Sequence, residues 1–274
     1  MATVSKRFLD RAKPAIRKYQ KLLGEARKRD VNESDTCVIV SDFLQDVLGY
    51  DKYADVTTEF AVRSTFCDLA IKSSGRVQYL IEVKSVGTDL KDNHVRQATD
   101  YAANEGVDWV LLTNGTCWHA YKLRFEKPVQ HQEVFSLDLL DDAMKLSDAL
   151  EKLYLISREA GGDTAISSYW QQKEATSRYV VSQLLLGDAV TGLIRRELRR
   201  LFQGVRVSEE QLAGLLQTEV IKRDCLEGER AASAARLVRK GERRRRRLKA
   251  DSPDTPVTAL PVPPATPKAP ALPA

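Results

Sequence analysis

Histidine and cysteine are scarce in this sequence. Its 274 residues include three histidines, which form no ligand cluster, and four cysteines, none of which is paired at metal-ligand spacing. Zinc sites built from such clusters are therefore not expected. Scattered single thiols also argue against a disulfide-stapled secreted domain, and they indicate a reduced, cytoplasmic protein.

Long apolar runs are absent too. No stretch of the chain approaches the roughly 20 apolar residues that a membrane-spanning helix needs. The first ten residues also lack the apolar segment of a signal peptide. We therefore expect a cytoplasmic protein with no membrane partner.

Positive charge is present, but it is unevenly distributed. The net charge is only +5, whereas basic residues are concentrated in the first thirty positions and again between Arg195 and Lys249. Segregation of this kind favours a polyanionic partner more than the net value does. The run from Arg243 to Arg247 is therefore expected to contact nucleic acid, although a solvated charge run is the alternative.

The first 160 residues mix two hydrophobic periods, which predicts an α/β fold. Helical spacing predicts a basic amphipathic helix at 6–28, a second helix after the capping residues 32–34, and further helices at 89–105 and 138–157. A period of two predicts strands at 56–62, 66–72, 77–85, 109–113, 117–123 and 132–135. The turn at 73–75 and the Asn114-Gly115 pair predict two hairpins.

The rest of the chain shows no strand pattern. Glu159 to Asp163 is glycine-rich and marks the best internal boundary. Long helical patterns at 168–204 and 208–240 predict an α-helical extension over 165–240. The tail at 241–274 begins with a basic run, and from Ser252 onward it is rich in proline, alanine and threonine, where we expect disorder.

Charged residues interrupt two of the apolar strands. Asp68 stands alone in one of them, and Glu82 and Lys84 share one face of the next because side chains alternate along a strand. Charges buried in this way are costly unless they are paired or bind a metal. Two close carboxylates can hold Mg²⁺, the Val83 carbonyl can add a ligand, and Lys84 can position an attacking water. The set predicts metal-assisted hydrolysis of a phosphodiester.

The following helix offers a second wall for this site. His94, Gln97 and Tyr101 share one helical face, so Gln97 and Tyr101 can contact a phosphate or metal-bound waters together. The simpler interpretation is a solvated helix face with an aromatic at the core edge. Glu33, likewise, can be a charge that is favoured at a helix start.

Residues 30 to about 140 resemble the N-terminal nuclease domain of type I restriction enzyme R subunits, within the PD-(D/E)xK nuclease superfamily. The resemblance rests on residues 32–35, 48–51, 67–68, 82–84, 97–101 and 112–115, followed by Trp118 and Tyr121. It implies a restriction-endonuclease-like core, in which a mixed β-sheet is flanked by helices. It also implies Asp68, Glu82 and the Val83 carbonyl as metal ligands, Lys84 as the catalytic lysine, and further site positions at Gln97, Tyr101 and Glu33.

The sequence patterns and the resemblance together divide the chain into four segments: a basic N-terminal helix at 1–30, a nuclease-like domain at 31–158, the helical extension at 165–240 and the tail at 241–274. Cys67 stands where the superfamily has its proline, but that position is not a ligand. R subunits continue into a motor, and this sequence has no Gly-rich phosphate loop for one. We therefore expect a free-standing nuclease-like protein or one component of a larger system.

The leading hypothesis is an endonuclease that depends on Mg²⁺, with Mn²⁺ as a possible substitute, and that cleaves DNA in restriction or defence. Protein partners of such a system would bind through the helical extension. The alternative is a non-catalytic binding or assembly protein on a nuclease scaffold, and a third possibility is an RNA substrate.

Overall fold

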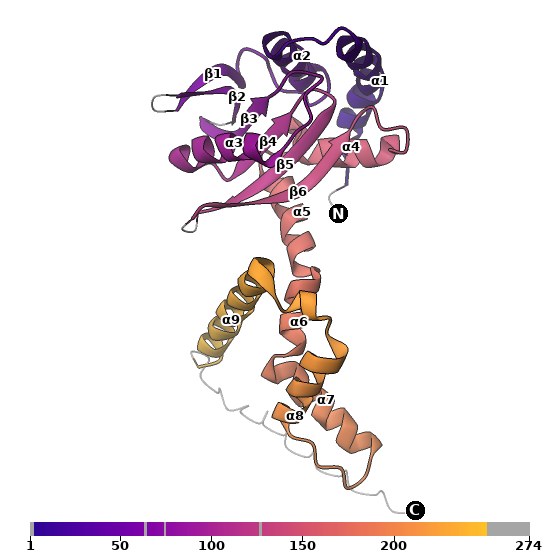
Figure 1. Ribbon diagram of the computed structural model, residues 1–274, viewed down its shortest axis with the longest axis vertical. Helices are drawn as coiled ribbons and strands as arrows, with labels where there is room; N and C mark the ends of the chain where they lie inside the picture. Colours follow the sequence, from indigo (N-terminus) through magenta and orange to yellow (C-terminus); the bar gives the residue numbers. More distant parts are fainter. Residues whose placement is uncertain (1–2, 63–64, 74, 126–127, 251–274) are drawn as a thin grey trace, which may run out of the picture. The chain divides into compact units, whose positions relative to one another are not determined.

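The computed structural model describes residues 3–62, 65–73, 75–125 and 128–250. The chain divides into two compact units, Met1–Glu174 and Ala175–Ala274. The turn residue Ser74 and the proline- and alanine-rich segment from Asp251 onward lie outside the described residues. The predicted α/β class is confirmed, with a mixed sheet, flanking helices and a helical C-terminal part (Figure 1).

A six-stranded sheet forms the centre of the first unit. Its strands are β1 (Val56–Val62), β2 (Thr65–Ser73), β3 (Arg76–Val83), β4 (Trp109–Thr113), β5 (Cys117–Arg124) and β6 (Gln130–Asp138). They lie in the order β1-β2-β3-β4-β5-β6, and β3 pairs with β4 in parallel while the other neighbours are antiparallel. The parallel pair needs a crossover, which α3 (Asp92–Glu105) provides.

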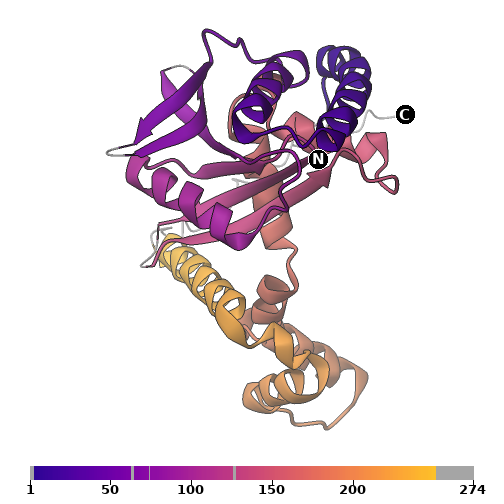
Figure 2. The same ribbon diagram turned by 45° about the horizontal axis from the view of Figure 1, so that its top comes forward.

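Helices cover both faces of this sheet. One face packs against α1 (Lys6–Lys28), α2 (Glu33–Asp46), α4 (Leu146–Leu155) and the start of α5 (Thr164–Ala175). The other face packs against α3, with Val95, Ala98 and Ala102 buried on it (Figures 1 and 2). The sheet is therefore buried between two helical layers. The chain leaves the carboxyl end of β3 at Val83 and enters α3 at Asp92.

The basic N-terminal helix is part of this core, although it was expected as a separate segment. The apolar side chains on one face of α1 are all buried, from Phe8 at its start to Leu23 near its end. Burial of such a face contributes more to stability than helix propensity does. The first unit also extends past the boundary expected at 159–163, because Ala165 and Ile166 of α5 join the same core.

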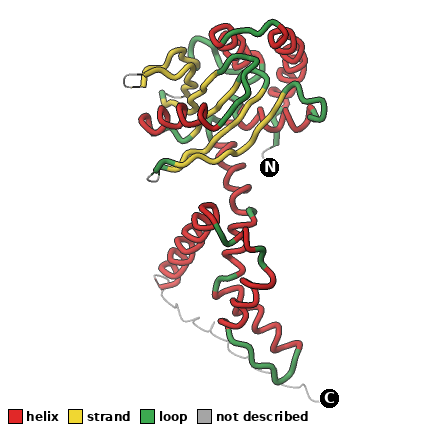
Figure 3. The backbone as a smooth tube through the Cα atoms, in the orientation of Figure 1, coloured by secondary structure: helices red, strands yellow, loops and turns green. Residues whose placement is uncertain are grey.

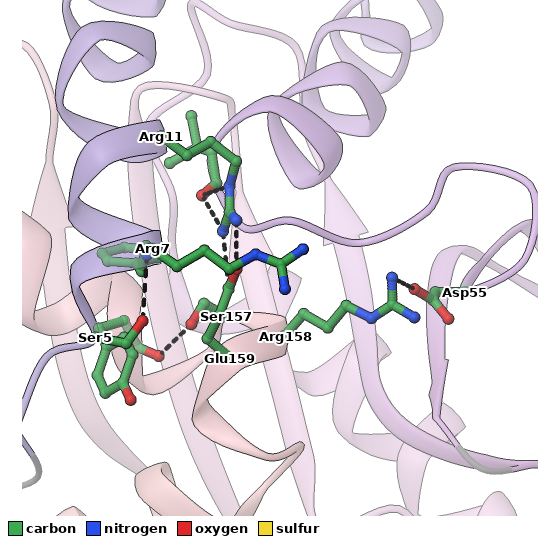
Figure 4. Close-up of polar contacts among 10 residues, drawn as sticks. Ser5, Arg7, Arg11, Asp55, Ser157, Arg158 and Glu159 are labelled. Atoms are coloured by element: carbon green, nitrogen blue, oxygen red, sulfur yellow. Dashed lines mark hydrogen bonds and ion pairs between the residues drawn. The ribbon is translucent and has the colours of Figure 1, made fainter.

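Arg11 joins α1 to the end of α4. Its guanidinium forms an ion pair with Glu159 and also donates hydrogen bonds to the Val47 carbonyl at 3.2 and 3.3 Å (Figure 4). A second contact, from Arg11 Nη2 to Glu159 Oε2, measures 2.8 Å. The Arg11 and Glu159 side chains are both mostly buried, so each charge needs the other to offset the cost of its burial.

We expect Arg11→Met to lower the free energy of unfolding by about 2 kcal/mol, because it leaves the Glu159 charge and the Val47 carbonyl without their main donor. Urea denaturation measures this loss. Arg7→Met is the control, since Arg7 is exposed and lies 3.9 Å from the same carboxylate. It should cost less than about 0.5 kcal/mol. Equal losses in the two variants would contradict the assigned role of Arg11.

The hairpin predicted from Asn114-Gly115 is confirmed between β4 and β5. Gly115 has a φ of +85°, and a Cβ there would lie 2.8 Å from Leu23 Cδ2 of α1. Its carbonyl also accepts a hydrogen bond from Trp118 Nε1. Glycine therefore allows the turn to fit beneath α1.

The helix expected at 138–157 begins later, at Leu146. The Asp138 carboxylate accepts a hydrogen bond from the Leu140 amide, and Asp141 does the same for Ala143. Aspartates that bond to nearby backbone in this way compete with helix formation. β6, in turn, is longer at both ends than the strand expected at 132–135.

The second unit consists of several separate helices rather than two long ones, and only α9 is long. They are α6 (Arg178–Leu185), α7 (Asp188–Leu201), α8 (Glu209–Leu215), the π-turn Leu216–Val220, a 3₁₀ turn at Arg223–Cys225 and α9 (Gly228–Ala250) (Figure 3). The pattern at 168–204 breaks at Ser177, whose hydroxyl caps α6 by accepting from the Val180 amide, and again at Gly187. The helical pattern was expected to end at about residue 240, but α9 continues through the basic run at 241–249, since arginine favours helix. Within the described ranges, no helix is long and apolar enough to cross a membrane.

Candidate active site at the carboxyl end of β3

Asp68 and Glu82 lie on neighbouring strands where the β2–β3 ladder ends. The last paired residues on this side are Leu69 and Ile81, so Asp68 and Glu82 are the next residues on their two strands. In place of a further backbone pair, the Val83 amide donates a 2.7 Å hydrogen bond to Asp68 Oδ2. The Asp68 carboxylate is thereby fixed beside the end of β3.

Lys84 completes this group. Alternation along the chain places Glu82 and Lys84 on the same side, while Val83 is fully buried in the opposite core, as the sequence predicted. Lys84 Nζ lies 2.7 Å from Glu82 Oε1 and 3.6 Å from Glu33 Oε2 at the start of α2. The Lys84 amide bonds to the Thr113 carbonyl at 2.8 Å, which holds the residue against β4.

Glu82 has an unusual electrostatic environment. Its side chain is 2% exposed, and its second oxygen, Oε2, is buried without a hydrogen-bond partner. Burial, opposed in part by the Lys84 hydrogen bond and reinforced by the Asp68 charge, raises the pKa of Glu82 to about 7. Leaving a buried carboxylate oxygen unpaired is costly, so this oxygen is available for a cation.

The pKa values of Asp68 and Lys84 are also shifted, in directions that agree with one cluster of interacting charges. Burial raises the pKa of Asp68, against the opposing effects of the Val83 amide and Lys84. Burial would lower the pKa of Lys84, but the hydrogen bond and charge of Glu82 outweigh it, and the pKa is raised. Lys84 therefore remains an ammonium that shields the two carboxylates from each other.

These residues fit a hard divalent cation such as Mg²⁺. Such an ion is usually bound by one or two carboxylates, with waters and substrate phosphates as the other ligands. Asp68 and Glu82 are two carboxylates, and the unpartnered Glu82 Oε2 is an oxygen that lacks its donor. Among residues 3–62, 65–73, 75–125 and 128–250, no three His, Cys, Asp or Glu side chains are grouped as ligands of one ion.

Gln97 and Tyr101 of α3 were expected to share one helical face and to contact a phosphate or metal-bound waters together. In the structure Gln97 Nε2 donates a 3.0 Å hydrogen bond to Tyr101 Oη, so the two side chains do lie on the same face. No hydrogen bond or ion pair in the described part of the chain joins either of them to Asp68, Glu82 or Lys84. Gln97 is exposed, and Tyr101 packs at the edge of the α3-side core.

Two further side chains feel the charges of this group although the sequence assigned neither of them a role in the site. Burial and the nearby Lys84 and Lys91 charges lower the pKa of His94. Burial and the charges of Asp68 and Glu33 raise the pKa of Cys37 to about 11. Helical spacing carries the relevant signal, since Cys37 follows Glu33 by four residues and His94 precedes Gln97 by three.

Comparison with known proteins identifies one family. The sequence model of the family described as the type I restriction enzyme R protein N terminus matches residues 38–137. The comparisons with curated proteins and with solved structures gave no match. The matched segment contains Asp68, Glu82, Lys84, Gln97 and Tyr101, whereas α1, Glu33 and the second unit lie outside it. Residues 38–137 are therefore similar to the type I restriction enzyme R protein N-terminal family.

Proposed function

We propose that this protein is a Mg²⁺-dependent endonuclease that hydrolyses DNA phosphodiester bonds in a restriction or defence system. The observation that carries the proposal is the buried Glu82 carboxylate at the carboxyl end of β3, which pairs with Lys84 through Oε1 and leaves Oε2 without a partner, next to the strand end that holds Asp68. The carboxyl ends of strands in open α/β sheets are common ligand sites. The family of residues 38–137 agrees with a nuclease-like role.

In this proposal Asp68 and Glu82 hold the cation, and the Val83 carbonyl contributes a further ligand. When bound, the cation would neutralise charge on the scissile phosphate and lower the pKa of a coordinated water. Mn²⁺, which also takes oxygen ligands, is a possible substitute.

The protein's own residues have distinct tasks in this reaction. The Val83 amide orients Asp68 through its 2.7 Å hydrogen bond, and Lys84 orients Glu82 in the same way. The Lys84 ammonium offsets charge on the phosphate and positions the attacking water. Glu33 keeps the Lys84 side chain near α2, and Gln97 with Tyr101 would contact the phosphate from α3.

The second unit is proposed to bind protein partners of the restriction system. Several of its large apolar side chains are more than half exposed, namely Leu201, Phe202, Leu215 and Val220. Exposed apolar groups of this size are typical of interaction surfaces. A cytoplasmic location belongs to the same proposal, and the four free cysteines suit a reducing compartment.

A non-catalytic assembly protein is the second candidate. It is favoured by the same exposed apolar side chains and by the lack of contact between Gln97 or Tyr101 and the carboxylates. It gives no physical reason for a buried Glu82 with an unpaired oxygen, and we therefore rank it second.

Cleavage assays separate these functions. The full chain should cut plasmid, linear, single-stranded or modified DNA in the presence of Mg²⁺ or Mn²⁺, and should be inactive with a chelator. RNA of matched length tests the third possibility, an RNA substrate. If the protein binds DNA but cuts none of these substrates with either metal, the endonuclease proposal is wrong.

A further inference from the structure

The outer face of α1 is a feature that the nuclease site does not use. The inner face of α1 is buried in the core, since its apolar side chains are no more than 2% exposed. These side chains are Phe8, Ala12, Ile16, Tyr19, Leu23 and Ala26. An amphipathic helix that buries its apolar face in its own domain cannot insert that face into a membrane. The polar face must therefore be explained separately.

Five basic residues lie along that polar face, and we call them the α1 basic stripe. They are Lys6, Lys13, Arg17, Lys21 and Lys28, and all five are exposed. Their spacings of seven, four, four and seven residues return to the same side of a helix, opposite the buried face. At 1.5 Å per residue the stripe is about 33 Å long, comparable with one turn of B-DNA at about 34 Å.

The stripe differs from Arg7, Arg11 and Lys18 of the same helix, which lie within 4 Å of acidic side chains. Arg11 is paired with Glu159, and Lys18 lies 2.9 Å from Asp46. Across the part of the chain that the structure describes, no stripe residue forms an ion pair with an acidic side chain. Asp10 and Glu25 are also on α1, but neither is within ion-pair distance of the stripe. Five charges of one sign are thus held in a row without neutralisation.

The stripe leads toward the candidate active site. Lys28 is the last residue of α1, and Glu33 begins α2 five residues later. Five residues of chain span at most about 17 Å. Glu33 Oε2 is 3.6 Å from Lys84 Nζ, so the end of the stripe and the site are close within one compact unit.

We propose that the α1 basic stripe binds the phosphate backbone of the DNA that is cleaved at the Asp68–Glu82–Lys84 site. This inference rests on the proposed function, and it adds a binding surface that lies outside the family-matched residues. Charge complementarity supports it, because duplex DNA presents regularly spaced phosphates, and lysine or arginine contacts release condensed counterions. The stripe carries no sequence information, and it positions the duplex.

The test compares full-length Arg17→Gln/Lys21→Gln with Arg76→Gln/Lys145→Gln, which removes two exposed charges elsewhere in the first unit. Binding to a labelled duplex is measured with a chelator over a range of salt concentrations. Two lost phosphate contacts should reduce the slope of log affinity against log salt by about 1.8, and the control should keep the wild-type slope. Glutamine is a good helix former, and circular dichroism checks that α1 is retained.

An unchanged slope in the stripe variant, or an equal loss in the control, would overturn the proposal. So would competition by polyglutamate as effective as competition by DNA, which would indicate an acidic protein as the partner. Cleavage with Mg²⁺ is measured on the same samples. If wild type cleaves DNA normally but the stripe variant has the wild-type slope, only the stripe proposal is wrong. If the stripe variant has a reduced slope but wild type cleaves no DNA, only the endonuclease proposal is wrong.

Discussion

Metal-dependent DNA cleavage is expected to fall about 10³-fold or more when Lys84, Asp68 or Glu82 is replaced by alanine, because each change removes a group that acts on the developing charge. Lys84→Ala removes the ammonium that lies 2.7 Å from Glu82 Oε1. Asp68→Ala and Glu82→Ala remove the oxygens that would hold the cation. Initial rates on plasmid DNA, measured with saturating Mg²⁺ or Mn²⁺, provide the comparison.

The matched control for this prediction is a second lysine–carboxylate pair. Lys122 Nζ lies 2.6 Å from Asp108 Oδ2, and the Lys122 side chain is 14% exposed, against 13% for Lys84. Lys122→Ala and Asp108→Ala should leave cleavage within a few-fold of wild type. If cleavage survives in all three site variants, the active site has been assigned to the wrong residues.

The stability of the metal-free protein is expected to decrease between pH 5 and pH 8 because of Glu82. Its pKa is raised from 4.5 to about 7 in the folded state, so folding favours the protonated carboxyl. The stabilisation is fully present below the unfolded-state value, and it is lost as the pH rises through the folded-state value. A difference of about 2.5 pKa units corresponds to about 3 kcal/mol, and this difference already includes the opposing effect of Lys84.

Glu82→Gln isolates this contribution. The variant has no carboxyl to titrate at position 82, and the remaining groups, including His94 with its lowered pKa, are the same in both proteins. Urea denaturation with a chelator at several pH values gives the two curves. Wild type should lose stability relative to the variant as the pH rises, and parallel curves would show that Glu82 titrates normally.

The local elements of the first unit were largely predictable from the sequence. Alternation and turn residues are short-range signals, and they correctly predicted the strands and the Asn114-Gly115 hairpin. The same alternation predicted that Glu82 and Lys84 share a side while Val83 enters the core. The longer-range features were missed. Nothing in the spacing of α1 distinguishes a helix that completes the core from a separate one, because that depends on the sheet beneath it.

The helical unit shows a different limit. Single residues, Ser177 and Gly187, divide a continuous helical pattern into three helices. In the sequence, one such residue is a weaker signal than the apolar period on either side of it. On α3, helical spacing predicted that Gln97 and Tyr101 share one face, and their hydrogen bond agrees with this. It did not give the hydrogen bond from Val83 to Asp68, because that contact appears only where two strands stop pairing.

Calorimetric titration of the full chain with Mn²⁺ or Mg²⁺ tests most directly whether the carboxylates at the end of β3 form a metal site. Wild type should bind metal, and Asp68→Ala and Glu82→Ala should each lose that binding, while Asp108→Ala keeps it. A wild-type protein that binds neither ion, or site variants that bind as wild type does, would contradict the metal-assisted mechanism and favour an assembly protein on a nuclease scaffold.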